Sequence, residues 1–442
     1  MSSLCPLRLC GDNFMNKMII QGKIPGAQDP VNILIEGGTV ARVEPYRQEI
    51  HFDTFDGVKP RFLNRGKKRR SVSTLSIPRA LVLSAVEGSD RGVEWVDFGG
   101  PDLYLCRGFF DPQVNGFGGV DFNGNDLALE GVHQAVLSLA STGVTRFFPT
   151  LITASHEKTV RQLEILIKAH ETDPIFERMC AGFHLEGPYI SPEDGPRGAH
   201  PRHFVRPPKW EELERFQEAC GGKIRVITLA PEVEGAIAFI EKAVARGMVV
   251  GLAHTNASEE ILEEAVRAGA RLSCHLGNGA HAILPRHRNP IQKQLAMDGL
   301  MASIIADGIH LPDYVVRNFV RGKGIDRILL TTDSMAGAGA PAGRYTLGDL
   351  EVEIGEDRTA RLAGTPYLAG STLTMDQAIN NVIRFTGVNL VAAIQMAARN
   401  GGKLFPEVEE QILPGHPADL VLFGYKEELV VRQTWIHGEK IF

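Results

Sequence analysis

The stretch MVVGLAHTNASEEILEEAVRAGARLSCHLGN, residues 248–278, decides the fold of this chain. It opens with an apolar run, continues through the helical pattern SEEILEEAVRAGA, and closes on a second, mainly apolar run. We expect Ser258 to cap the helix, because its hydroxyl can accept a hydrogen bond from a first-turn amide. A strand, a helix and another strand in this order predict a parallel sheet that helices cover on its outer face.

The same alternation extends outward from this stretch in both directions. The strand-like runs are CRGFFDPQVN, VTRFFPTLIT, MCAGFHLEGP, KIRVITLAPE, MVVGLAHTN, RLSCHLGN, LMASIIADGIH and RILLTTDS, with helical patterns such as EGVHQAVLSLAST between them. Eight such units in about 230 residues match an α/β fold of the (β/α)8 TIM-barrel type. An open doubly wound sheet would carry a glycine-rich phosphate loop after its first strand, and NGFGGVDFNG does not have that spacing.

Both ends of the chain are strand-like and differ from the middle. Residues 17–45 alternate around the Gly37-Gly38 pair, which predicts a hairpin. The C-terminal run PADLVLFGYKEELVVRQTWIHGEKIF is strand-like as well. We therefore expect a small β-sandwich domain built from residues 1–104 and 412–442, with the barrel at residues 105–411.

Residues 46–92 interrupt the first part of this small domain. They contain the basic run RFLNRGKKRR, residues 61–70, followed by a serine-rich stretch. A nuclear or nucleic-acid patch is one interpretation of the basic run. A solvated insertion between two strands is the simpler one, and we expect an insertion.

Composition and charge exclude several classes of protein. The 442 residues are 43% hydrophobic and carry a net charge of -6, which disfavours nucleic-acid binding. No apolar stretch approaches the roughly 18–20 residues that span a bilayer, and the N-terminus MSSLCPLRLCGDNF lacks the features of a signal peptide. The six cysteines are scattered without a CxxC pair, which favours a reducing compartment. We expect a cytoplasmic protein that binds neither nucleic acid nor a membrane.

Polar side chains gather at the ends of the predicted strands. The pairs, in chain order, are Gln113 and Asn115, His184 and Glu186, His254 and Asn256, His275 and Asn278, and Asp307 and His310, with Asp333 alone at the last strand. A barrel brings the carboxyl ends of its strands together at one mouth. A single histidine there is commonly structural. Several histidines and acids together cost too much desolvation unless they are paired or bind a cation.

These residue types predict a catalytic metal site. Two histidines and a glutamate with one open position are a ligand pattern of catalytic zinc, and Glu186, His254 and His275 supply it. A divalent cation can lower the pKa of water from about 15.7 to near 7, and Asp333 would then accept the proton and return it to the departing amine. His200 could donate a hydrogen bond to the developing oxyanion, although its context, DGPRGAH, also fits a surface histidine.

Segments at and near the strand ends fit the pattern of one known family. They are GFFDPQVNG (108–116), HLEGP (184–188), GAH (198–200), LAPE (229–232), HTNA (254–257), ADGIH (306–310), TD (332–333) and LAGS (368–371). In them the chain resembles the amidohydrolase superfamily, and within it the N-acetylglucosamine-6-phosphate deacetylases. Most amidohydrolases carry H-x-H where these deacetylases and this chain have Q-x-N. The resemblance covers about residues 100–442.

The resemblance implies a cofactor and roles for particular residues. It implies one divalent cation per subunit on Glu186, His254 and His275, with zinc expected and iron, manganese or cobalt also compatible with the ligands. It further implies catalysis by Asp333 with His200. Contacts to the sugar are expected from Gln113, Asn115 and His310.

One loop departs from the family pattern. Family members have T-H-L-[FY]-N-A-M after the sixth strand and then an arginine in an R-D-P or R-E-P context, whereas this chain reads CHLGNGA (274–280) and PRHRNP (285–290). In the family this loop holds the phosphate, with an arginine from a neighbouring subunit. The resemblance therefore implies Asn278, Gly279 and Arg288 as phosphate contacts, with Arg286 as a substitute for Arg288, and a homodimer.

The expected activity is metal-dependent hydrolysis of the acetamide of a small-molecule amino sugar phosphate. N-acetylglucosamine 6-phosphate would give glucosamine 6-phosphate and acetate. One alternative is another amidohydrolase acting on a different amide or cyclic amide, for whose two-metal site Gln113 and Asn115 would be poor ligands. A second alternative is a catalytically silent binding barrel, which the joint presence of three ligands and Asp333 disfavours.

Overall fold

The computed structural model describes residues 17–27, 30–45, 93–96, 103–408 and 411–442. The insertion predicted at residues 46–92, with its basic run, lies outside the described residues. Among the described residues, no helix has both the length and the apolar character needed to cross a membrane.

Eight parallel strands form the central sheet. They are β6 (Phe109–Val114), β9 (Val144–Ile152), β10 (Phe183–Glu186), β11 (Ile224–Leu229), β12 (Val249–Leu252), β13 (Leu272–Ser273), β14 (Met301–Ile304) and β15 (Ile328–Leu330), paired in sequence order. A parallel bridge between Val114 and Ser334 joins the end of β6 to the segment after β15 and closes the sheet. The predicted (β/α)8 barrel is confirmed.

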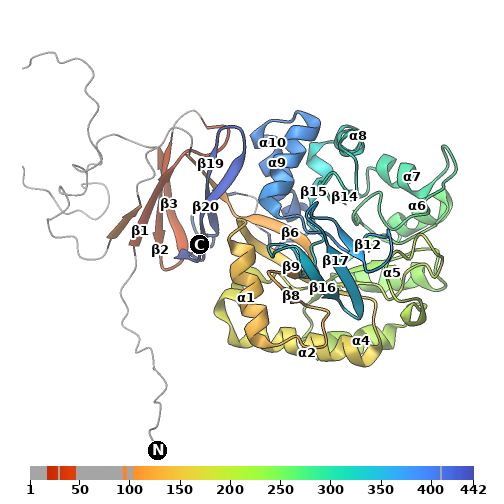
Figure 1. The fold of residues 1–442 in the computed structure, drawn as a ribbon. Coiled ribbons are helices and arrows are strands. Elements are labelled where there is room, and N and C mark those ends of the chain that lie inside the picture. The colour runs from red at the N-terminus through yellow and green to blue at the C-terminus, as the bar shows by residue number, and fades with distance from the viewer. Residues whose placement is uncertain (1–16, 28–29, 46–92, 97–102, 409–410) are drawn as a thin grey trace, which may run out of the picture.

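Helices surround this sheet (Figure 1). They are α1 (Leu129–Ala140), α2 (His156–Thr172), α3 (Pro174–Met179), α4 (Trp210–Ala219), α5 (Ala236–Ala245), α6 (Glu259–Arg267), α7 (Pro290–Ala296), α8 (Asp313–Lys323), α9 (Met375–Thr386) and α10 (Leu390–Ile394). The cap predicted at Ser258 is present, because its side chain accepts a hydrogen bond from the backbone of Ile261 at the start of α6.

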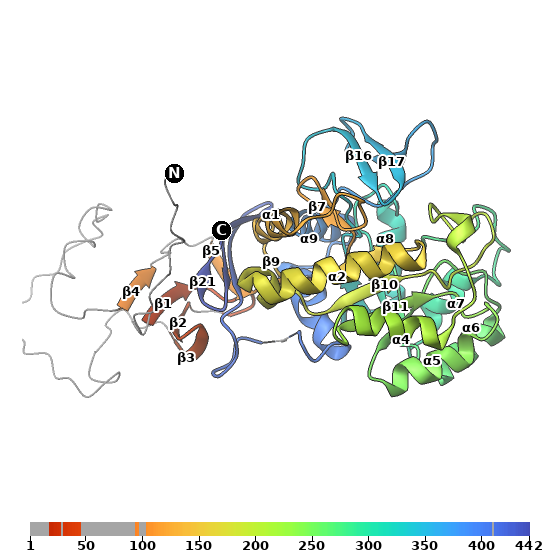
Figure 2. The same ribbon diagram turned by 90° about the horizontal axis from the view of Figure 1, so that it is seen from below.

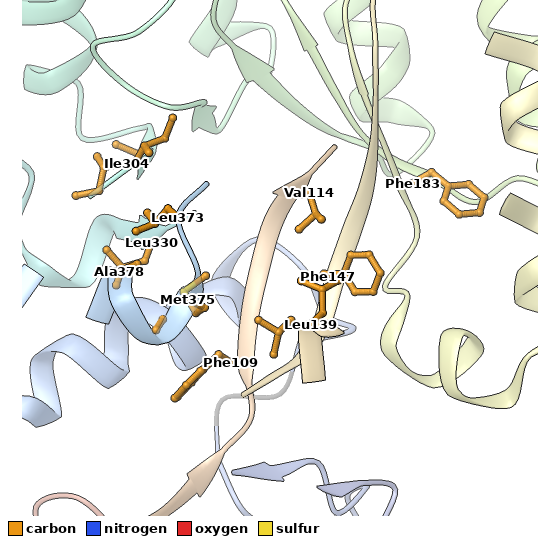
Figure 3. Close-up of a cluster of buried hydrophobic side chains, with 14 of the residues drawn as sticks. Phe109, Val114, Leu139, Phe147, Phe183, Ile304, Leu330, Leu373, Met375 and Ala378 are labelled. Carbon is orange, nitrogen blue, oxygen red and sulfur yellow. The ribbon is translucent and has the colours of Figure 1, made fainter. Parts of the chain in front are cut away.

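The largest core lies between the barrel strands and these helices. Figure 3 shows part of it, where Leu139 of α1 faces Phe147 of β9, and Met375 of α9 lies beside Leu330 of β15. All four side chains are buried. Full burial of one such side chain is worth about 1.5–3 kcal/mol, so this core fixes the strands whose ends carry the polar residues.

The two ends of the chain form two mainly antiparallel sheets beside the barrel. One contains β1 (Lys17–Gly22), β2 (Val31–Glu36), β3 (Thr39–Pro45) and β4 (Val93–Val96); the other contains β5 (Leu103–Arg107), β19 (Leu420–Tyr425), β20 (Leu429–Ile436) and β21 (Glu439–Lys440). Ile20 and Ile33 from the first sheet share a buried core with Leu105 and Trp435 from the second. The predicted β-sandwich from both chain ends is therefore confirmed, whereas its boundaries at residues 104 and 411 stay a prediction.

The hairpin predicted at Gly37-Gly38 is present. It joins β2 to β3, and both glycines have the positive φ that a tight hairpin turn requires.

The run CRGFFDPQVN, predicted as one strand, is divided between two sheets. Cys106 belongs to β5, which pairs with β19, and the barrel strand begins at Phe109. A Cβ at Gly108 would lie 2.0 Å from Oγ1 of Thr145, so glycine is required where the chain crosses between the sheets.

Two short sheets, which the sequence did not predict, add to the carboxyl-end side of the barrel. They are β7 (Gly116–Phe117) with β8 (Val120–Asp121), and β16 (Gly343–Leu347) with β17 (Leu350–Ile354) and β18 (Ala360–Leu362). Figure 2 shows β16 and β17 raised above the barrel. The turn between them is tied down, because the backbone amide of Gly348 donates to Asp121 at 2.8 Å and Lys158 donates to Asp349 at 2.7 Å.

Candidate metal centre

Three side chains from separate barrel strands converge at the carboxyl ends of those strands. Glu186 is the last residue of β10, and His254 and His275 lie two residues beyond the ends of β12 and β13. Both histidines have a positive φ, 51° and 30°, a conformation that costs a side-chain-bearing residue about 1–3 kcal/mol. The packed strands sustain this conformation, and it turns both imidazoles toward Glu186.

The donor atoms of these residues are close enough to share one ion. Nε2 of His275 and Nε2 of His254 lie 2.7 and 3.1 Å from Oε1 of Glu186. One ligand atom from each of the three residues lies within 4.8 Å of the others, and all three residues are buried. Within the described ranges, no other group of histidine, cysteine and carboxylate side chains has this geometry.

The protonation pattern around this group fits a cation. Nδ1 of His254 lies 2.9 Å from the carbonyl oxygen of Pro196, and because a carbonyl can only accept, Nδ1 carries the hydrogen. With a cation bound between the two residues, Nε2 would direct its lone pair at the cation, since the hydrogen of a neutral ring is on Nδ1. Burial alone would raise the pKa of Glu186, but hydrogen bonds and charge from the two imidazoles hold it well below its usual value, so the carboxylate is ionised.

Asp333 faces the same cavity from the segment after β15. It has a positive φ of 48°. Nε2 of Gln113 and Nδ2 of Asn115 both donate to its Oδ1, at 2.8 and 2.7 Å. Burial, and next the negative charge of Glu186, raise the pKa of Asp333 to about 6. Because both amides hold the same oxygen, Oδ2 is left to interact with a ligand.

A second buried aspartate, which the sequence analysis did not single out, ties this arrangement together. Asp111 lies inside β6 and accepts hydrogen bonds from Thr331 at 3.0 Å, from the backbone and hydroxyl of Thr332, and from the backbone of Gln113. It therefore joins the end of β6, which carries the amides, to the end of β15, which leads to Asp333. The signal in the sequence is an acid in the middle of the apolar run FFDPQV.

His200 is buried at the cavity and is not the surface histidine of the competing interpretation. Its Nε2 lies 4.0 Å from Oε2 of Glu186, and its ring packs edge-on against that of His254 with centroids 4.4 Å apart. Burial, and next the nearby His254, lower the pKa of His200 to about 3, so the ring is neutral. His184 differs, because Thr228 and the carbonyl of Pro112 bond both of its ring nitrogens away from the cavity.

The other residues expected to contact the substrate fall into two groups. His310, Asn278 and Gly279 line the same cavity as the three candidate ligands. Nδ1 of His310 donates to Asp307 at 2.6 Å, so Nε2 is the ring nitrogen left for a ligand. Arg288 is not brought to the cavity by this chain: its side chain is 89% exposed and its nearest partner is Glu259 at 4.0 Å.

The cavity has a volume of about 150 Å³, and its lining residues are of two chemical kinds. The polar ones are Glu186, His254, His275, His200 and Asp333. The apolar ones are Ile152, Leu347, Leu350 and Leu368, of which Leu347 belongs to β16 and Leu350 to β17. The arrangement can hold a cation and a small polar molecule, with a proton acceptor and a hydrogen-bond donor beside the reacting group.

Residues 104–441 match the model of the amidohydrolase family. Relatives include an N-acetylglucosamine-6-phosphate deacetylase of Lysinibacillus sphaericus, 32% identical over 78% of this chain and 86% of the relative. The enzyme of the same name from Homo sapiens is 34% identical over 76% of this chain and 83% of its own length.

Solved structures of deacetylases also superpose on this chain over most of its length. The N-acetylglucosamine-6-phosphate deacetylase of Thermotoga maritima is 28% identical and superposes with a TM-score of 0.74 over 96% of this chain and 99% of that one. A mutant of the Mycobacterium smegmatis deacetylase in complex with N-acetyl-D-glucosamine-6-phosphate is 25% identical, with a TM-score of 0.74 over 96% of this chain and 97% of that one.

Proposed function

Since the chain belongs to the amidohydrolase family and, within it, to the N-acetylglucosamine-6-phosphate deacetylases, we propose that it hydrolyses N-acetylglucosamine 6-phosphate to glucosamine 6-phosphate and acetate. It is a hydrolase that cleaves a linear amide bond. The observation that carries the proposal is the convergence of Glu186, His254 and His275 in one cavity with Asp333.

The three converging side chains would hold one divalent cation per subunit, which we propose to be zinc. Two imidazoles and a carboxylate are ligands that zinc accepts, and iron, manganese and cobalt accept them too. When bound, such a cation supplies the Lewis acidity that lowers the pKa of water and polarises the amide carbonyl. The two amides on Oδ1 of Asp333 support a single cation, because neutral N–H donors occupy that oxygen.

Asp333 would move the proton. Its free Oδ2 accepts a proton as the water oxygen attacks the acetyl carbon, and it later delivers that proton to the amine nitrogen as the C–N bond breaks. The burial that raises its pKa to about 6 suits a group that must both accept and release a proton near neutral pH. His200 would donate from Nε2 to the carbonyl oxygen, where negative charge develops.

The remaining cavity residues would bind the sugar phosphate. Nε2 of His310 can accept from a sugar hydroxyl, and Asn278 and Gly279 can approach the phosphate. A Cβ at Gly279 would lie 2.7 Å from Nδ1 of His254, so only glycine lets this loop pass so close to the ring. Arg288 is exposed in this chain, and we propose that it completes the phosphate site of a second subunit in a homodimer.

We place the enzyme in the cytoplasm. The described cysteines Cys106, Cys180, Cys220 and Cys274 are all buried free thiols, which supports a reducing compartment.

An acetate-release assay tests the proposed function. The purified protein, stripped of metal and reloaded with zinc, is given N-acetylglucosamine and N-acetylgalactosamine, each with and without a 6-phosphate. We expect release from N-acetylglucosamine 6-phosphate with the highest kcat/KM, and none after metal removal. Release confined to a cyclic amide, or no release from any N-acetyl sugar, would refute the proposal.

A further inference from the structure

Thr153 lies directly beyond the end of β9 and is 2% exposed. Its Oγ1 lies 2.8 Å from Nδ1 of His200, and its backbone nitrogen lies 3.4 Å from the same atom. The hydroxyl is confined as well, because a Cβ at Gly187 would lie 2.3 Å from Oγ1. One residue therefore presents two hydrogen-bonding groups to the same ring nitrogen of His200.

These two groups determine which ring nitrogen carries the hydrogen. A backbone N–H can only donate, so a hydrogen on Nδ1 of His200 would oppose the amide hydrogen of Thr153. A threonine hydroxyl can rotate to donate, and it then matches a lone pair on Nδ1. Both groups thus favour the tautomer in which Nδ1 accepts and Nε2 carries the hydrogen.

The other side of the ring faces the cavity. Nε2 of His200 lies 4.0 Å from the nearer oxygen of Glu186, beyond hydrogen-bond distance, so its hydrogen remains available to a ligand. The backbone of His200 is held separately, because its carbonyl accepts from Arg197 at 2.6 Å and its amide donates to the Arg197 carbonyl at 3.3 Å. The contacts of Thr153 consequently bear on the orientation of the ring rather than on the course of the loop.

We infer that Thr153 is a positioning residue for the hydrolysis: it orients the His200 imidazole and keeps Nε2 as the donor to the substrate carbonyl oxygen. This inference rests on the proposed function, since it concerns the same oxyanion. In the other tautomer Nε2 would carry a lone pair. That lone pair would face the developing negative charge on the carbonyl oxygen and repel it.

Kinetics of paired variants test the inference. Thr153→Val keeps the shape and removes the hydroxyl, and we expect kcat to fall about three- to tenfold, as for the loss of one hydrogen bond, with KM and metal content unchanged. Thr153→Ser retains the hydroxyl and should recover most of the loss. Thr159→Val is the matched control, since Thr159 is equally buried but bonds the backbone of Ser155 in α2, and its kcat should equal that of the wild type.

A double-mutant cycle separates positioning from a general effect on packing. In a His200→Ala background, Thr153→Val should change kcat no further, because the ring on which it acts is gone. A fall of the same size in both backgrounds, or an unchanged kcat in Thr153→Val alone, would overturn the inference.

Nuclear magnetic resonance of the ¹⁵N-histidine-labelled protein measures the tautomer without any substrate. We expect an Nε2–H, Nδ1-acceptor pattern for His200, and loss of the Nδ1 hydrogen-bond signature in Thr153→Val. An Nδ1–H tautomer in the wild-type protein would refute the inference. This outcome is independent of the acetate-release assay, so the failure of one proposal is distinguishable from the failure of the other.

Discussion

Replacing Asn115 with leucine separates two accounts of this residue. The sequence motif implies a contact to the sugar, whereas the structure shows its Nδ2 donating to Oδ1 of Asp333 at 2.7 Å. Leucine has nearly the same size and lacks the donor. If Asn115 serves to orient Asp333, Asn115→Leu should lower kcat; if it holds the sugar, the variant should mainly raise KM.

The size of the effect follows from the hydrogen bond that is lost. A hydrogen bond to a charged group contributes about 1.5–3 kcal/mol, and each 1.36 kcal/mol changes a rate tenfold. We expect kcat to fall about tenfold to 150-fold. The effect should not reach that of losing Asp333 itself, because Gln113 still donates to the same oxygen at 2.8 Å.

The assay is steady-state acetate release from N-acetylglucosamine 6-phosphate, with the metal content of each preparation measured alongside. Gln395→Leu is the matched control, because Gln395 also donates an amide hydrogen to a carboxylate, that of Asp326, just before β15 at the opposite end of the barrel. Its kcat should not change. A raised KM with unchanged kcat in Asn115→Leu would refute the orienting role. So would a fall in kcat that is equally large when Asn115→Leu is introduced into the wild type and into Asp333→Asn.

Four further outcomes are expected. Asp333→Asn should retain its metal and lose nearly all turnover, and an active variant would remove Asp333 from proton transfer. His275→Ala should bind less than a tenth of the wild-type metal by atomic emission, whereas full occupancy would exclude it as a ligand. Arg288→Ala should raise KM about tenfold or more for the phosphorylated sugar only; an equal change for the unphosphorylated sugar would argue against phosphate binding. Burial lowers the pKa of Lys323 to about 8, so the unfolded state binds more protons than the folded state between pH 8 and about 10.4. The Tm of the wild type relative to Lys323→Met should therefore rise across that window, and a falling difference would contradict the shift.

Much of the fold could be predicted because its signals are local. The alternation of apolar runs and helical patterns gave all eight barrel strands, and Ser258 marked the start of α6. The candidate ligands followed from one further rule, that a barrel gathers the carboxyl ends of its strands. Each ligand could be assigned to a strand end without knowledge of any distance.

The contacts between distant residues could not be predicted in this way. The bond from Gln113 to Asp333 spans 220 positions, and nothing in the local pattern distinguishes an amide that holds a carboxylate from one that holds a sugar. The sheet of β16, β17 and β18 was missed because its strands are only three to five residues long and follow the last barrel strand, outside the alternation of strands and helices. Its apolar contribution to the cavity, from Leu347 and Leu350, was missed with it.

The sandwich that joins the two chain ends has a consequence for protein synthesis. Arg107 of β5 donates to the carbonyl of Pro417, 310 positions later, and all five residues of β5 pair with β19. While the chain emerges from the ribosome, Ile20, Ile33 and Leu105 can pack together, but the part of their core supplied by Leu420 and Trp435 is missing until almost the whole polypeptide has been translated. The core of the sandwich is therefore completed only near the end of elongation, and until then its early apolar side chains remain partly exposed to solvent.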